Sequence, residues 1–155
     1  MRKKTYLTKQ GLLEARAEID HLTRLYKPGL LRTLEEIYTE KNLAEDALYD
    51  RAKNDLSSVE RRITELEELI NSATVVERGN NKRVSVGSKI ILKFLPDNKT
   101  KTYYVVGTHE ADPFKNRISN ESPIVQAILG KKVNETATVS LGLKEFNVKI
   151  LRIFA

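Results

Sequence analysis

The chain has 155 residues, no cysteine and a formal net charge of +6. The lack of cysteine excludes a disulfide framework and thiolate zinc sites, and the two histidines, His21 and His109, are too far apart in sequence to indicate a metal site. No window approaches the roughly 18 apolar residues of a membrane span, and no apolar core follows the basic start "MRKKTYLTKQG", so we expect a cytoplasmic protein without a secretory signal.

Apolar residues recur every three or four positions through the first part of the chain. These residues are Leu12, Ala15, Ile19, Leu22, Tyr26, Leu30, Leu34 and Ile37. The spacing predicts one stripe of a helix that begins near Thr8, a suitable N-cap, and continues to about residue 40. Pro28 interrupts this helix and has no backbone donor, so we expect a local kink there.

A second stripe of the same period follows a short acidic stretch, "EKNLAEDALYD", residues 40–50. Its members are Ala52, Leu56, Val59, Ile63, Leu66 and Ile70. Neither stripe can bury itself, so the two helices are expected to cover each other as an antiparallel coiled-coil hairpin. The tip of this hairpin then falls near residues 40–47, which include Glu45 and Asp46. A helix over residues 8–40 is roughly 45 Å long, so the tip should project well away from any compact domain.

Beyond the linker near Gly79 the period changes to the alternation typical of strands, with Gly87 at a turn or bulge. Strands are predicted at about 84–94, at 99–106 after a turn at 96–98, and in the segments "ATVSL" and "EFNVKILRIF". The segment "SPIVQAILG" predicts a short helix with Ser122 as N-cap, Pro123 in the first turn and Gly130 as the stop. The fold class is therefore α+β, with a helical hairpin over 1–76 and a small, mostly antiparallel β domain with one helix over 77–155.

The positive charge lies in the second domain. Residues 1–75 carry 13 Lys and Arg against 14 Asp and Glu, whereas residues 76–155 carry 14 against 7. Such an excess favours contact with phosphate backbones or with an acidic protein surface, although a solvated basic face is the commoner explanation.

Two stretches, "LTKQGLLEARAEIDHL" and "ISNESPIVQAILGKKVNETATV", resemble the opening helix and the Ser-Pro-Ile segment of the GreA/GreB family of bacterial transcript-cleavage factors. Pro28 also falls where that family commonly has a proline, and the resemblance covers nearly the whole chain. It implies an FKBP-like fold for the second domain, which in the family docks on the rim of RNA polymerase.

The resemblance also implies a function. In this family the hairpin enters the secondary channel of RNA polymerase, where tip carboxylates help to hold Mg²⁺ and backtracked RNA is cleaved in the active site of the polymerase. The chain is then an activator rather than an enzyme, and it shares Mg²⁺ with the polymerase without binding the ion alone. Its implied partners are RNA polymerase and the RNA 3′ end within the elongation complex, and we expect a monomer that does not contact membranes.

The tip differs from the family pattern Gly-Asp-Leu-x-Glu-Asn-x-Glu-Tyr. Leu43, Glu45 and Tyr49 match it. Asn42 stands where the pattern has Asp, Asp46 where it has Asn, and Leu48 where it has Glu. An amide offers Mg²⁺ an oxygen but no negative charge, so Asn42 should be the weaker ligand. Glu45 and Asp46 are therefore the expected catalytic and metal-binding residues, with Asn42 as the altered position.

Two alternatives stay open at this stage. The chain could enter the same channel and inhibit or retune the polymerase without cleaving RNA, because the tip carboxylates are rearranged. It could also be a coiled-coil adaptor whose acidic turn is merely solvated. Tyr49, Arg51 and Lys53 are candidate contacts to RNA or to the channel wall, as are Arg61 and Arg62, although charged residues are also what the outer face of a coiled coil needs.

Overall fold

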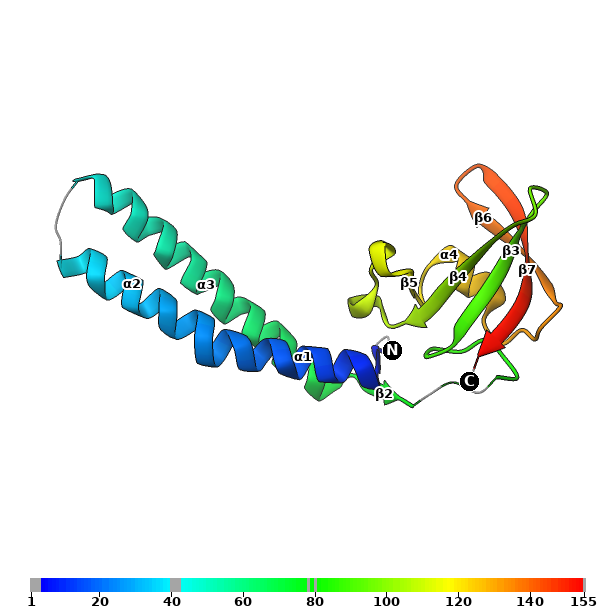
Figure 1. Ribbon diagram of the computed structural model, residues 1–155, viewed down its shortest axis with the longest axis horizontal. Coiled ribbons are helices and arrows are strands. Elements are labelled where there is room, and N and C mark those ends of the chain that lie inside the picture. Colours follow the sequence, from blue (N-terminus) through cyan, green and yellow to red (C-terminus); the bar gives the residue numbers. More distant parts are fainter. Residues whose placement is uncertain (1–3, 40–42, 78, 80, 155) are drawn as a thin grey trace. The chain divides into compact units, whose positions relative to one another are not determined.

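The computed structural model describes residues 4–39, 43–77, 79 and 81–154 (Figure 1). The chain forms two units, a helical unit of Leu12–Ser72 and a sheet unit made of the segments before and after it. The predicted ranges were 1–76 and 77–155. The two units divide the chain differently, because both ends of the segment predicted as the hairpin belong to the sheet unit.

The helical unit is the predicted antiparallel hairpin (Figure 1). Its first arm consists of α1 (Lys9–His21), a π-helical segment η1 (Leu22–Tyr26) and α2 (Lys27–Thr39). Its second arm is the single helix α3 (Leu43–Ser72). Thr8 caps the first arm as predicted, because its hydroxyl oxygen accepts the backbone N–H of Gly11 at 3.0 Å.

The seam between the arms follows the two predicted stripes. Ala52, Val59 and Leu66 of α3 are buried, as is Ala15 of α1, and the other predicted members except Tyr26 are half-buried. Small and branched side chains at these positions let two amphipathic helices exclude water along a narrow seam. Hydrophobic burial along this seam therefore holds the hairpin together.

The first arm changes from α-helical to π-helical geometry just before Pro28, the residue at which we expected a kink. The residues before it form the π-helical segment, in which the N–H of Lys27 bonds the carbonyl of Leu22, five residues back. The extra residue in this turn shifts the stripe by one position. The prediction for Tyr26 is therefore wrong: it is 45% exposed, and Lys27 takes its place in the sequence of half-buried positions.

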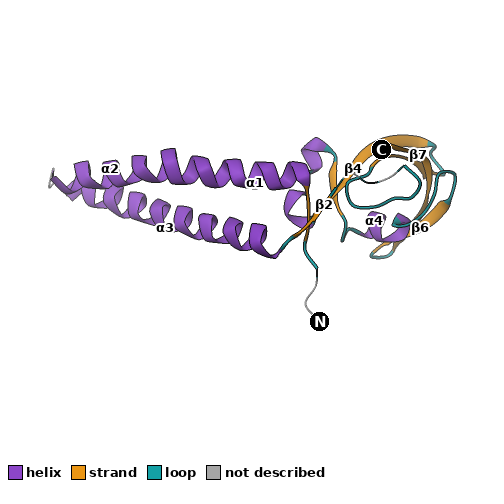
Figure 2. Cartoon of the chain, turned by 90° about the horizontal axis from the view of Figure 1, so that it is seen from below, coloured by secondary structure: helices purple, strands orange, loops and turns teal. Residues whose placement is uncertain are grey.

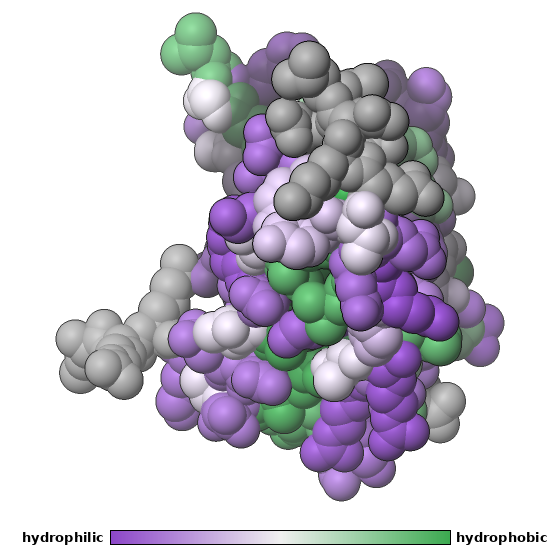
Figure 3. All heavy atoms as spheres, turned by 90° about the vertical axis from the view of Figure 1, so that its left-hand side faces the viewer, coloured by the Kyte–Doolittle hydropathy of each residue, from purple (hydrophilic) through white to green (hydrophobic). Residues whose placement is uncertain are grey.

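Ion pairs join the two arms outside the seam. Arg62 of α3 donates to both carboxylate oxygens of Glu18 at 2.8 and 3.1 Å, and Lys27 lies 3.5 Å from Glu60. The hydrogen bond to Glu18 raises the pKa of Arg62, so this guanidinium stays charged. Figure 3 shows the molecule from the left-hand side of Figure 1, and hydrophilic residues make up much of this face, with apolar residues between them.

The sheet unit contains the predicted β domain. Its strands are β3 (Lys89–Leu95), β4 (Lys99–Val106), β5 (Arg117–Ser119), β6 (Thr136–Leu141) and β7 (Lys144–Phe154). They form one sheet in the order β5-β4-β3-β7-β6, in which only β4 and β5 are parallel. The prediction of a mostly antiparallel sheet is confirmed.

One helix, α4 (Pro123–Ile128), packs on this sheet and lies inside its curl (Figure 2). The hydroxyl oxygen of Ser122 accepts the N–H of Val125 at 3.4 Å, which is the predicted N-cap. Val125 and Ile128 join the fully buried residues Ile90 and Leu92 of β3 in the core. Two short 3₁₀ helices, η2 (Thr108–Glu110) and η3 (Pro113–Lys115), connect β4 to β5.

Three strands of three residues each were not predicted, namely β5 and two strands outside the five-stranded sheet. β1 (Tyr6–Thr8) pairs in parallel with β2 (Thr74–Val76), so the segments that enter and leave the hairpin are hydrogen-bonded to each other within the sheet unit. Among the described residues, no helix combines the length and the apolarity that crossing a membrane requires.

Candidate functional site

The hairpin reverses between Thr39, where α2 ends, and Leu43, where α3 begins. Glu45 and Asp46 are the third and fourth residues of α3, while Asn42 lies outside the described residues. The side chains of Glu45 and Asp46 also lie outside the described part of the chain, so only their backbone is placed. A position in the first turn of a helix suits carboxylates, because the helix dipole is positive at this end.

The candidate contact residues follow on α3. Tyr49 is half-buried and lies three residues before the buried Ala52, so it continues the seam between the arms. Arg51 and Lys53 are exposed and flank Ala52, roughly 100° to either side around the helix. The structure therefore gives Tyr49 a packing position and leaves Arg51 and Lys53 available on two different faces.

Arg62 and Leu48 are less suited to a functional site at the tip. Arg62 is engaged in the ion pair with Glu18, which assigns it to holding the arms together. Leu48, at the position where the family pattern has Glu, is 54% exposed. Within residues 4–39, 43–77, 79 and 81–154, no three His, Cys, Asp or Glu side chains come together in a way that could hold a metal ion.

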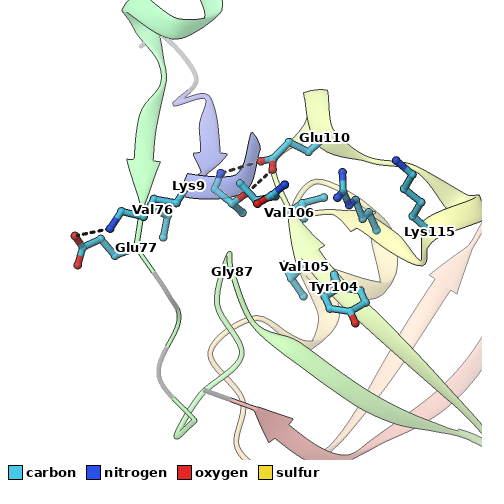
Figure 4. Close-up of a pocket in the computed structure, with 12 residues that line it drawn as sticks. Lys9, Val76, Glu77, Gly87, Tyr104, Val105, Val106, Glu110 and Lys115 are labelled. Carbon is cyan, nitrogen blue, oxygen red and sulfur yellow. Dashed lines mark hydrogen bonds and ion pairs between the residues drawn. The ribbon is translucent and has the colours of Figure 1, made fainter. Parts of the chain in front are cut away.

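A second cluster lies at the root of the hairpin, and sequence reasoning missed it. Glu110 of η2 accepts the backbone N–H of Thr8 at 2.8 Å, the Thr8 hydroxyl, and the N–H of Gly107 at 3.3 Å (Figure 4). The Thr8 hydroxyl in turn accepts the N–H of Gly11. One carboxylate thus fastens the N-cap of α1 to the loop after β4, and we call this network the Glu110 clasp.

The two glycines of the clasp are required by space. A Cβ at Gly11 would overlap the carboxylate of Glu110, and a Cβ at Gly107 would overlap the carbonyl oxygen of Tyr6. The only sequence signal for this contact is glycine at both positions. Gly107 is only three residues from Glu110, but without knowledge of the fold nothing links Gly11 to a glutamate 99 residues further along the chain.

The clasp borders a cleft of about 690 Å³ within the sheet unit. The start of α1, β2, β4 and the loop before β5 line it (Figure 4). Its charged lining residues are Lys9, Glu77, Glu110, Lys115 and Arg117. Glu77 and Lys9 pair at 3.9 Å across the mouth, and both side chains are largely exposed.

Two family models together match almost the whole chain. The model described as transcription elongation factor, GreA/GreB, C-term, matches residues 79–154, and the model described as transcription elongation factor, N-terminal, matches residues 5–75.

Individual relatives agree with these matches. A protein named transcription elongation factor GreA from Mycoplasma mycoides subsp. mycoides is 42% identical over 156 residues, covering 99% of each chain. A protein of the same name from Bacillus subtilis is 35% identical over 148 residues, covering 95% of this chain and 94% of its own. Among solved structures, one titled "Structure of the transcription factor Gfh1" aligns over the full length of both chains with 22% identity and a TM-score of 0.46.

Proposed function

Because this chain belongs to the GreA/GreB family of transcription elongation factors, we propose that it inserts its hairpin into the secondary channel of bacterial RNA polymerase and stimulates Mg²⁺-dependent cleavage of backtracked RNA. It acts on the active site of the polymerase and is not an enzyme by itself. The observation that carries this proposal is the family match over both units, combined with two carboxylates at the start of α3.

The form of the hairpin supports delivery into a deep channel. α3 has 30 residues, which at 1.5 Å per residue gives about 45 Å. The buried seam and the Arg62–Glu18 pair hold the arms together before any partner is met. A preordered hairpin loses little conformational entropy on binding, so its end groups can be positioned at a small entropic cost.

The donor set at this end fits a magnesium ion. Glu45 and Asp46 supply carboxylate oxygens, the hard ligands that Mg²⁺ prefers, and Asn42 can add an uncharged carbonyl oxygen. In a two-metal site the ion stabilises the attacking and leaving oxygens of the reaction. In this proposal the chain presents its carboxylates, and the polymerase provides the remaining metal ligands and the RNA.

Arg51 and Lys53 add positive charge to the turns of α3 that follow Glu45 and Asp46. Both are exposed on α3 within about two turns of Glu45, so they can contact RNA phosphates or an acidic channel wall. Their position flanking the seam leaves them free to do so without opening the hairpin. Tyr49, in contrast, contributes by fixing the first turns of α3 against the other arm.

The test uses a stalled, backtracked elongation complex with the chain and Mg²⁺. We expect release of short RNA fragments from the 3′ end, and loss of that release in Glu45→Ala or Asp46→Ala. Each variant should still compete with another secondary-channel factor for the polymerase, because the hairpin itself is unchanged. A chain that neither competes for the polymerase nor releases fragments would refute the proposal and leave the coiled-coil adaptor.

A second function is favoured by one observation at the tip. Asn42 and the exposed Leu48 stand where the family pattern has carboxylates, which reduces the negative charge available to a metal. A chain with this tip could occupy the channel and slow elongation without cleavage. Two measurements separate the functions. If weak metal binding limits a cleaving wild type, Asn42→Asp increases fragment release. If the wild type slows elongation and releases no RNA, the non-cleaving regulator is favoured.

A further inference from the structure

The five-stranded sheet buries only one of its faces. Ile90 and Leu92 of β3 are fully buried in the core with α4, whereas Lys89, Ile91 and Lys93 alternate with them and lie on the opposite face. We call this the outer face. In the rows of these three residues, strand register adds Tyr104, Thr102 and Thr100 on β4, Phe154, Arg152 and Lys149 on β7, and Thr136 on β6. All ten residues are half-buried or exposed.

The outer face is basic. Four of these ten residues are Lys or Arg and none is acidic, and the acidic residue Glu145 follows on the same face only beyond the end of β3. Lys93 lies directly opposite Lys149 in the register of β3 and β7. Like charges placed opposite each other on neighbouring strands destabilise a sheet, and neither lysine has an ion-pair partner among the residues that the structure describes. A bound anion would relieve this repulsion.

Aromatic rings lie beside the other two cations of the outer face, Lys89 and Arg152. The Lys89 ammonium lies 5.5 Å from the ring centre of Tyr104 and 4.9 Å from that of Phe154. The guanidinium carbon of Arg152 lies 4.4 Å from the centre of Phe154. Tyr104 is 42% exposed. The face therefore presents flat groups, a phenol ring and a guanidinium plane, on which nucleobases can stack.

We propose that the outer face binds single-stranded nucleic acid, with Lys93 and Lys149 contacting phosphates while Tyr104 and Arg152 stack on bases. Rows along β3 are roughly 6.8 Å apart, so a strand laid along the sheet meets successive rows of cations and flat groups. An acidic polypeptide would use the cations but would leave the flat groups without a matching partner. This inference does not depend on the proposed function, because it concerns the sheet unit and not the end of the hairpin.

The first test measures how the full chain binds a short, fluorescently labelled polyuridine RNA, by anisotropy over a range of salt concentrations. Lys93→Ala with Lys149→Ala removes two phosphate contacts, which should weaken binding about 25-fold at about 0.1 M salt and reduce the slope of log affinity against log salt by about 1.4. The matched control is Lys99→Ala with Lys101→Ala. These lysines pair with Phe94 and Leu92, so they project from the other side of the same sheet.

The control pair has the same change in charge and should retain an affinity close to that of the wild type. Equal weakening by both pairs would overturn the assignment to the outer face. Lysine footprinting of the wild-type chain gives a result that does not depend on the variants folding. RNA should protect Lys93 and Lys149 from methylation and leave Lys99 and Lys101 reactive, and the reverse pattern would also overturn the proposal.

The second test separates nucleic acid from an acidic protein surface. Tyr104→Leu keeps an apolar side chain but removes the ring, and should weaken binding of the RNA by about fivefold or more. Single-stranded DNA of the same length serves as the second nucleic-acid probe and should depend on the same residues. If polyglutamate competes as well as RNA does, and Tyr104→Leu changes neither affinity, the face binds acidic polypeptides and the proposal fails.

Discussion

The Glu110 clasp predicts a specific loss of stability when its carboxylate is removed. Glu110→Ala leaves the N–H groups of Thr8 and Gly107 and the Thr8 hydroxyl without their acceptor. Hydrogen bonds to a charged group contribute about 1.5–3 kcal/mol each, and the longer bond to Gly107 and the partial exposure of the site reduce the total. We expect the free energy of unfolding to fall by about 3 kcal/mol.

Thr8→Ala tests the same network from its other end. It removes the N-cap of α1 and one donor to Glu110, and should cost about 1–2 kcal/mol. The double variant Thr8→Ala with Glu110→Ala loses the hydrogen bond between these two residues only once. Its loss of stability should therefore be smaller than the sum of the two single losses by about 1 kcal/mol. Urea denaturation followed by circular dichroism gives all four values of the cycle.

The matched control is Glu77→Ala. Glu77 lies at the same cleft, but its side chain is 85% exposed and 3.9 Å from Lys9, so its removal should leave stability unchanged within error. Thr8→Ser, which keeps the hydroxyl, should also retain most of the stability. A Glu110→Ala variant as stable as Glu77→Ala, or strictly additive losses at Thr8 and Glu110, would refute the clasp.

Two further predictions concern the hairpin. Leu66 is 3% exposed, so Leu66→Ala should lower the free energy of unfolding by about 2–4 kcal/mol. Leu13 is 61% exposed, so Leu13→Ala should change that free energy by less than about 0.5 kcal/mol. Equal effects of the two variants in urea denaturation would contradict the assignment of Leu66 to the buried seam. Arg62→Ala should cost about 0.5–1 kcal/mol, a loss that shrinks in high salt because the pair with Glu18 is about half exposed, and a loss independent of salt would argue against that pair.

Periodicity predicted most of the fold because the buried stripes dominate both arms. The 3,4 spacing from Leu12 to Ile37 predicted a helix, and the structure has one. The sequence could not predict which residues continue that stripe beside Pro28, because the turn before the proline contains one residue more than an ordinary α-helical turn. Tyr26 was misplaced for this reason alone.

Contacts between distant segments were beyond the sequence. β1 and β2 are three residues each and pair across more than sixty residues, so neither carries a recognisable pattern. The Glu110 clasp joins positions 102 residues apart in the same way. The pairing of Lys93 with Lys149 likewise becomes visible only with strand register, although the excess of positive charge in the second half had indicated a basic face.

At the tip, residue types carried the prediction. Glu45 was selected because it matches a family pattern, and Asp46 because it places a carboxylate where that pattern has Asn. The structure adds that both belong to the first turns of a helix that begins at Leu43. Tyr49 was selected as a contact residue, and its half-buried position on the seam gives it a structural role at the base of the tip. Asn42 lies outside the described residues, so its role rests on the family pattern.

The central claim is that carboxylates at the start of α3 act in the active site of RNA polymerase. The most direct measurement is the rate of 3′ fragment release from a backtracked complex saturated with the wild-type chain or with Glu45→Gln and Asp46→Asn combined, which keep shape but remove charge. The account predicts that the wild type accelerates release and that the combined variant loses at least about tenfold of that rate while still competing for the polymerase. Equal rates for the two chains would contradict it.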